Sequence, residues 1–274
     1  MSTKRSKSWL KTMATSDGCR VVLSGQMAAR PSRHWLVFLP GSSAELYTTQ
    51  DDHFEELFGP LLASVNLLII NKCGISRTGR IRQAEFSRGG DRLVRIRHVL
   101  ECLDQVIPPR HRICLVGHSE GGYIAPEVAT RSRKVKAIIS LAAGTRGWLE
   151  EEFAKAKPKE RLALAESMIR LHQNPTQLRK WRGHIPRTWL SYSETAPVSW
   201  LRRAQLPLFS AFGAEDDLID VRSAERDLRN LRRSHNFPVQ KKKLSGLDHD
   251  FNGDWSVLRR SSMKFLAVHF MSKN

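Results

Sequence analysis

The chain has 274 residues, 41% of them hydrophobic, which is long enough to bury the core of a single α/β domain. No stretch approaches 18 uninterrupted apolar residues and no sustained apolar segment follows the basic first residues, so we expect a cytoplasmic protein without a membrane span or secretory signal. The net charge of +18 suggests a polyanion partner, but the basic residues are spread over every segment without a nucleic-acid-binding module. We therefore predict a basic, solvated surface rather than a nucleic-acid site.

The first half of the chain predicts a β-hairpin followed by alternating strands and helices. Ser16-Asp17-Gly18 is a turn signal between two strand-like runs. Continuous apolar runs such as Trp35–Leu39 are typical of strands buried on both faces, and apolar residues at helical spacing predict the helices between them. The Arg-rich segment 75–88 has no regular pattern, and we expect a loop there. The predicted strands are 7–14, 19–24, 35–39, 67–70 and 113–116, and the predicted helices are 51–63, 91–107 and 123–130.

The second half continues this alternation around one long helical stretch. Strands are predicted at 135–141, 206–212 and 239–244, and helices at 150–172, 175–181, 221–234 and 255–270. Between Thr145 and Arg203 the strand signal disappears, which predicts a helical lid insertion within one domain of residues 1–274. Eight strands that mostly alternate with helices favour a largely parallel sheet with helices on both faces. The insertion contains four tryptophans, which either line a lid-covered pocket or pack among its helices: Trp148, Trp181, Trp189 and Trp200.

One stretch predicts a catalytic turn between a strand and a helix. The apolar run 113–116 ends abruptly at Gly117-His118-Ser119-Glu120-Gly121, and a helix-compatible segment follows. So tight a turn strains the residue at its apex and leaves no room for side chains two positions to either side, where Gly117 and Gly121 stand. Ser119 would then project its hydroxyl above the strand end, and the N–H of Glu120 would point toward a developing oxyanion. The alternative is a glycine-rich turn of an ordinary α/β unit, unless an acid and a histidine follow at suitable places.

Two later loops supply an acid and a histidine. Asp216 follows the seventh predicted strand and His249 follows the eighth. Ligands of open parallel sheets collect beyond the carboxyl ends of the strands, so these side chains should lie near Ser119. A serine hydroxyl needs a histidine base, which in turn needs a carboxylate to fix its tautomer.

Each assignment has a structural alternative. Asp216 could, together with the acids beside it, be only a solvated cap on the next helix. Asp248 or Asp250 could pair with His249 on the surface. His118 is interpreted as an orienting or packing residue rather than a catalytic one.

In this chain order the nucleophile, acid and histidine resemble those of the α/β-hydrolase family. The resemblance covers about residues 7–270 and rests on the Ser119 turn, on Gly-x-x-Asp after the seventh strand and on Gly-x-x-His after the eighth. It implies that Ser119 is the nucleophile, His249 the general base and Asp216 its orienting acid. It also implies that the N–H groups of Glu120 and of Ser42 form the oxyanion hole. Many relatives carry His-Gly where this chain has Pro40-Gly41, which leaves the choice between Ser42 and Ser43 open.

The form Gly-His-Ser-Glu-Gly-Gly is similar to the turns of dienelactone-hydrolase-like, thioesterase-like and peptidase-like members of that family. The resemblance therefore implies a serine hydrolase that cleaves a small-molecule carboxylic ester or thioester through an acyl-enzyme. A peptidase of the same fold and a non-catalytic ligand-binding protein are the alternatives. Acyl length and the number of subunits stay open. We expect no metal or other cofactor, because the cysteines lack metal-type spacing and are predicted to be buried free thiols: Cys19, Cys73, Cys102 and Cys114.

Overall fold

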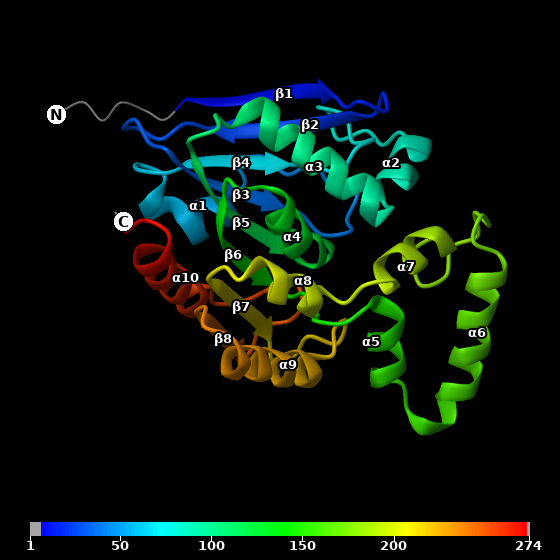
Figure 1. Ribbon diagram of the computed structural model, residues 1–274. Helices are drawn as coiled ribbons and strands as arrows, with labels where there is room; N and C mark the ends of the chain where they lie inside the picture. Colours follow the sequence, from blue (N-terminus) through cyan, green and yellow to red (C-terminus); the bar gives the residue numbers. More distant parts are fainter. Residues whose placement is uncertain (1–6, 273–274) are drawn as a thin grey trace.

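The computed structural model describes residues 7–272, which form one eight-stranded sheet with helices on both faces (Figure 1). The strand order is β1-β2-β4-β3-β5-β6-β7-β8. Strand β2 is antiparallel to both of its neighbours, and all the other neighbouring pairs are parallel, so the predicted mostly parallel sheet is confirmed. The strands are β1 (Ser8–Ala14), β2 (Arg20–Gln26), β3 (His34–Leu39), β4 (Asn66–Ile70), β5 (Arg112–His118), β6 (Val135–Leu141), β7 (Leu208–Gly213) and β8 (Val239–Leu244).

The described residues form ten α-helices, most of which cover the sheet in two layers. They are α1 (Asp52–Phe58), α2 (Gln83–Gly89), α3 (Arg92–Val106), α4 (Glu120–Arg131), α5 (Trp148–Lys155), α6 (Arg161–Gln173), α7 (Pro186–Ser193), α8 (Pro197–Ala204), α9 (Val221–Ser234) and α10 (Ser256–His269), with short 3-10 turns η1 (Gly59–Leu61) and η2 (Pro158–Glu160). Successive strand residues point to opposite faces. On β3, for example, Val37 packs in the core beneath α3, α4, α8 and α9, whereas Leu36 packs in the core beneath α1 and α10. The sheet is therefore buried on both sides.

Most predicted elements agree with the structure to within two residues, and four predictions were wrong. Helix α1 ends at Phe58 because Gly59-Pro60 replaces its last turn with η1. The expected loop 75–88 contains helix α2, which packs against α3. In the insertion, Pro158 splits the predicted helix 150–172 into α5 and α6, and the predicted helix 175–181 is irregular. The remaining helices there, α7 and α8, both begin at a proline in the first helical position.

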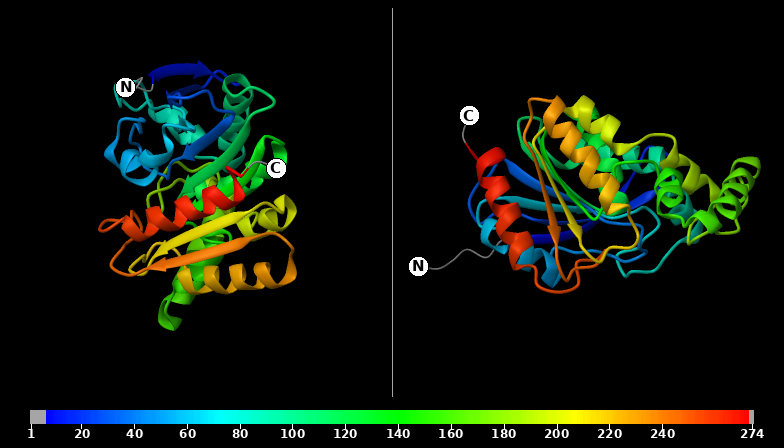
Figure 2. Two further views of the ribbon diagram at one scale, coloured as in Figure 1. Left: turned by 90° about the vertical axis from the view of Figure 1, so that its left-hand side faces the viewer. Right: turned by 90° about the horizontal axis from the view of Figure 1, so that it is seen from below.

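The helices between β6 and β7 leave the sheet at its carboxyl-end edge. Helices α5, α6 and α7 extend beyond the strand arrowheads and project away from both termini (Figures 1 and 2). Helix α8 instead packs against α4 and lies in the layer that flanks the sheet. The prolonged helical stretch of the sequence therefore divides into insertion helices, α5 to α7, and one ordinary sheet-flanking helix.

The state of the cysteines and the length of the helices are described for residues 7–272. All four cysteines fall in this range, and each is buried and free of disulfide bonds. No helix within it is both long and apolar enough to cross a membrane.

Candidate active site

Ser119 occupies the sharp turn between β5 and α4. Its backbone has φ +50° and ψ −120°, a conformation that non-glycine residues rarely adopt. A Cβ on Gly117 would lie 2.5 Å from the carbonyl oxygen of Gly121, and a Cβ on Gly121 would collide with the carbonyl of Leu39. Both glycines are therefore needed for the chain to turn this tightly beneath the serine.

The structure brings Ser119, His249 and Asp216 together from three separate loops. His249 Nε2 lies 2.8 Å from Ser119 Oγ, and His249 Nδ1 lies 3.0 and 3.1 Å from the two carboxylate oxygens of Asp216. The Asp216 side chain is fully buried, and its Oδ1 also accepts hydrogen bonds from the N–H groups of Leu218 and Ile219. A carboxylate at Nδ1 keeps the proton on that atom and leaves the Nε2 lone pair facing the serine hydroxyl.

The neighbouring acids have other partners. Asp220, not Asp216, caps helix α9, because its Oδ1 accepts from Ser223 N at 3.1 Å. Asp248 accepts hydrogen bonds from the following loop, including the side chain of Asn252. Asp250 is largely exposed, and its carboxylate lies 3.8 Å from His118 Nε2. The structural alternatives for Asp216 and His249 are thus not observed.

His118 holds the histidine loop against the strand that carries Ser119. Its Nε2 lies 3.0 Å from the carbonyl oxygen of His249. Burial lowers the pKa of His118 and favours the neutral ring. A neutral ring with its proton on Nε2 donates to this carbonyl. The contact agrees with the orienting role predicted from the sequence.

Ser42 and Ser43 lie on different sides of the loop that follows β3. Ser42 lines the same pocket as Ser119, whereas the hydroxyl of Ser43 lies 3.0 Å from the hydroxyl of Tyr47 and lines a neighbouring pocket. The loop approaches the nucleophile closely, because a Cβ on Gly41 would lie 3.2 Å from Ser119 Cβ. Within residues 7–272, neither the N–H of Ser42 nor that of Glu120 donates to a protein acceptor. Both N–H groups are therefore without a protein acceptor among these residues, as the N–H groups of an oxyanion hole must be.

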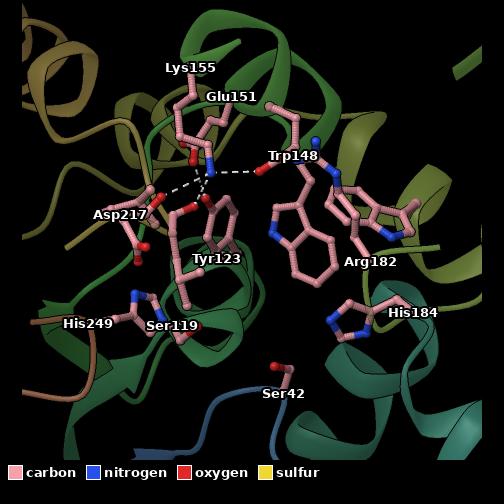
Figure 3. Close-up of a pocket in the computed structure, with 14 residues that line it drawn as sticks. Ser42, Ser119, Tyr123, Trp148, Glu151, Lys155, Arg182, His184, Asp217 and His249 are labelled. Atoms are coloured by element: carbon pink, nitrogen blue, oxygen red, sulfur yellow. Dashed lines mark hydrogen bonds and ion pairs between the residues drawn. The ribbon is translucent and has the colours of Figure 1, made fainter. Parts of the chain in front are cut away.

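A pocket of about 360 Å³ lies above Ser119, and insertion residues such as Trp148 and Lys155 line its opposite side (Figure 3). Trp148 and Trp189 line it, and Trp148 stacks on the Tyr192 ring with centroids 4.3 Å apart. The other two tryptophans do not line this pocket: Trp181 packs edge-on against Trp189, and Trp200 lies beneath the guanidinium of Arg203. Trp148 and Trp189 therefore line the pocket and also pack within the insertion, where Trp181 packs as well.

Several charged residues of this pocket were not predicted as site residues. Burial raises the pKa of Glu151 to about 7, although the Tyr123 hydroxyl donates to it at 2.5 Å. Burial likewise lowers the pKa of Lys155, whose ammonium lies 2.6 Å from Glu152 and 2.6 Å from the carbonyl oxygen of Leu218. The signal in the sequence was a run of three glutamates in an amphipathic helix. That pattern does not show which of the glutamates faces Ser119.

A second pocket, of about 270 Å³, lies on the other side of the same loops. Adjacent residues divide between the two pockets: Ser42, Ser119 and His249 line the first, and their chain neighbours Ser43, His118 and Asp250 line the second. The second pocket is walled mainly by apolar and aromatic side chains, among them Phe38, Tyr47, Phe54, Leu57, Phe251 and Trp255.

One cluster of metal-type ligands lies away from this site, beneath the β1–β2 turn. Ligand atoms of Asp17, Cys19 and His98 lie within 4.8 Å of one another. The Asp17 carboxylate already pairs with the guanidinium of Arg97 at 2.5 Å and with the His98 ring at 3.1 Å. These contacts satisfy the acid without a metal ion, and the cluster lines neither pocket.

Comparison with known proteins agrees with this geometry. The sequence pattern of a family described as "Alpha/beta hydrolase family" matches residues 36–241. No protein of curated function gives a significant match. Among solved structures, the chain is similar to Est1E from Butyrivibrio proteoclasticus, with 12% identity, a TM-score of 0.63 and coverage of 96% of this chain and 99% of Est1E.

Two further structures show the same fold with different activities in their names. An esterase of Pyrococcus furiosus, Pf2001, has 16% identity and a TM-score of 0.61 over 96% of this chain and 90% of the esterase. An acylaminoacyl peptidase of Pyrococcus horikoshii has 15% identity and a TM-score of 0.66 over 99% of this chain, but only 43% of the peptidase is covered. At these identities the likeness establishes the fold alone.

Proposed function

Because the chain belongs to the alpha/beta hydrolase family, we propose that it is a serine hydrolase that cleaves a carboxylic ester or thioester through an acyl-enzyme on Ser119. The observation that carries the proposal is the position of His249, with one ring nitrogen 2.8 Å from the hydroxyl of Ser119 and the other on the carboxylate of Asp216. This arrangement makes a weak nucleophile reactive at neutral pH.

The first half of the reaction acylates Ser119. His249 Nε2 takes the hydroxyl proton as the serine oxygen attacks the substrate carbonyl carbon, and Asp216 stabilises the resulting imidazolium. The carbonyl oxygen becomes an oxyanion that accepts hydrogen bonds from the N–H groups of Glu120 and Ser42. When the tetrahedral intermediate collapses, the imidazolium gives its proton to the departing alcohol or thiol.

The second half returns the enzyme to its starting state. His249 takes a proton from water, the hydroxide attacks the acyl carbon, and the acid product leaves as Ser119 regains its proton. Ser42 is preferred to Ser43 as the source of the second oxyanion N–H, because it shares the pocket with Ser119.

The predicted insertion at 145–203 acts as a cap over this site. Its helix α5 contributes Trp148 and Lys155 to the pocket, and α7 contributes Trp189. Helix α8 belongs to the sheet layer, so the cap proper consists of α5 to α7. Substrate selection is therefore assigned to these three helices and to the loops that connect them.

The decisive experiment measures hydrolysis of an ester and thioester panel of graded chain length by the wild type and Ser119→Ala. We expect turnover by the wild type and its loss in Ser119→Ala, together with stoichiometric modification of Ser119 by a fluorophosphonate, read by peptide mass. Ser43→Ala is the matched control and should retain turnover. Unchanged turnover in Ser119→Ala would reject the proposal, and cleavage of aminoacyl anilides without cleavage of esters would identify a peptidase instead.

A further inference from the structure

Two buried arginine–glutamate pairs join helices α3 and α4, and they are built alike. Arg92 pairs with Glu127 and, one helical turn later, Arg95 pairs with Glu120. The exposed fraction of all four side chains is 6% or less. Each pair also contacts insertion helix α7. Arg92 Nε donates to the carbonyl oxygen of Ser191 at 2.7 Å, and the Tyr192 hydroxyl donates to Glu120 Oε1 at 2.8 Å.

Only the second pair reaches the active site. Glu120 is the residue after Ser119, and Arg95 also donates to the carbonyl oxygen of Pro40, in the loop that carries Ser42. Lys72 completes the group, with its ammonium 3.0 Å from Glu120 Oε2. We call the four side chains Lys72, Arg95, Glu120 and Tyr192 the Glu120 cluster. The cluster bonds directly to both chain segments that supply the proposed oxyanion N–H groups.

The carboxylate of Glu120 stays ionised although it is buried. Burial opposes the ionisation of Glu120, but Lys72 and Arg95 outweigh it and hold the pKa of Glu120 at about 2. Burial lowers the pKa of Lys72, whereas Glu120 helps to keep the pKa of Arg95 high, so the guanidinium of Arg95 is the firmer of the two positive charges. Burying charges is costly unless the geometry is good and the hydrogen bonds are made. Here three partners contact the carboxylate and fix the side chain of the residue that follows Ser119.

We propose that the Glu120 cluster positions the oxyanion hole, and that Tyr192 makes this position depend on the docking of insertion helix α7. The inference rests on the proposed function, because it concerns the oxyanion formed when Ser119 attacks. None of the four side chains lines the pocket, so they act as positioning residues through the N–H groups of Glu120 and Ser42. A cap helix that moves away would take the Tyr192 hydroxyl from the carboxylate and loosen the hole.

The two arginines provide a matched test. Arg95→Lys keeps the positive charge, but a single ammonium cannot bridge Glu120 and Pro40 as the guanidinium does. Arg92→Lys makes the same change in the pair that does not touch the proposed oxyanion hole. Tyr192→Phe removes one hydroxyl from the cluster, and Ser191→Ala removes the neighbouring hydroxyl, which accepts from the backbone N–H of Arg92 at 3.1 Å and does not touch the cluster. All four substitutions are conservative, and thermal denaturation reports how much each destabilises the fold.

The main readout is the rate at which a fluorophosphonate modifies Ser119. In this reaction the serine oxygen bonds to phosphorus, fluoride leaves and the phosphoryl oxygen occupies the oxyanion hole, so no natural substrate is needed. We expect Arg95→Lys and Tyr192→Phe to slow the modification by about 10-fold, and to lower kcat on the best ester with little change in KM. Arg92→Lys and Ser191→Ala should stay within about twofold of the wild type, even where their stability falls equally.

The outcomes separate this inference from the proposed function. Equal effects of Arg95→Lys and Arg92→Lys, or a wild-type rate in Arg95→Lys, would overturn the positioning role while leaving the hydrolase intact. A wild type that reacts with the fluorophosphonate but cleaves no ester or thioester would refute the proposed substrate class, and the four modification rates would still decide the role of the cluster. A wild-type Ser119 that does not react would overturn both.

Discussion

His118 and His249 are joined by one hydrogen bond, from the ring of the first to the backbone carbonyl of the second, at 3.0 Å. The contact connects the end of β5 with the loop after β8, and their rings lie 5.4 Å apart. Since His118 immediately precedes Ser119, one side chain sets the spacing between the serine and the base that must reach it. The proposed catalytic distance of 2.8 Å therefore depends on a residue outside the Ser119, His249 and Asp216 group.

His118→Ala should lower kcat by about 10-fold without abolishing activity, because His249 remains paired with Asp216 but loses its backbone anchor. Steady-state kinetics on the best ester of the panel measures the effect. Asp250→Asn is the control, since the largely exposed Asp250 carboxylate lies 3.8 Å from the same ring and should matter little. Equal losses in both variants would contradict the anchoring role.

Asp216→Ala and Asp220→Ala should separate catalysis from stability. Removing the Asp216 carboxylate takes away the group that fixes the His249 tautomer, and kcat should fall by about 10³–10⁴-fold. Removing Asp220 removes the cap of α9, which should lower the free energy of unfolding by about 1 kcal/mol and leave kcat nearly unchanged. Urea titration and ester kinetics on both variants test the pair. A larger kinetic loss in Asp220→Ala would show that the acid was assigned to the wrong residue.

Glu151→Gln should change how stability depends on pH. Burial raises the pKa of Glu151 from 4.5 to about 7, so the folded wild type holds this proton more tightly than the unfolded chain does. Its stability should therefore fall as the pH rises from about 4.5 to about 7, by up to about 3 kcal/mol. Glutamine carries no titrating proton and is free of this penalty. Between pH 5 and pH 8, the free energy of urea unfolding should fall less in the variant than in the wild type. An equal pH dependence in the two proteins would refute the burial effect.

Gly121→Ala should destabilise the protein strongly, by about 3 kcal/mol or more, because its methyl group would collide with the carbonyl of Leu39 on the neighbouring strand. Gly90→Ala is the control. Gly90 has φ −75°, and a Cβ there would lie 3.1 Å from the Thr188 side chain, which needs only a small adjustment. Thermal denaturation of both variants measures the difference. A stable, active Gly121→Ala protein would mean that the turn is looser than the structure indicates.

The sheet was predictable because its strands are continuous apolar runs bounded by glycine and proline, such as 35–39 before Pro40-Gly41. Helix α9 was predicted with its observed bounds, since its apolar positions repeat at helical spacing. Helix α2 was missed because Ala84 and Phe86 are the only apolar side chains among its seven residues and give no helical repeat, whereas its packing against α3 supports the helix. The helix predicted at 175–181 does not form, for the opposite reason. The spacing of its residues is compatible with a helix, but packing against the rest of the protein does not support one.

The loop positions of the site were predictable from chain order, but its supporting contacts were not. Ser119, Asp216 and His249 each follow a strand, so topology alone placed them at one edge. Glu120 was considered only for its N–H, and nothing local indicates that its side chain meets Lys72 and Tyr192. Those partners are 48 and 72 residues away along the chain. Contacts of this kind appear only when helices α3, α4 and α7 are packed together.

Ser42, Ser119 and His249 line one pocket, and their chain neighbours Ser43, His118 and Asp250 line the other. These three pairs of adjacent residues therefore separate two pockets that share no lining residue. The first pocket is rich in charged side chains, and the second is rich in aromatic rings. Side chains of one pocket can consequently be exchanged without changing the lining of the other or the residues that stand between them.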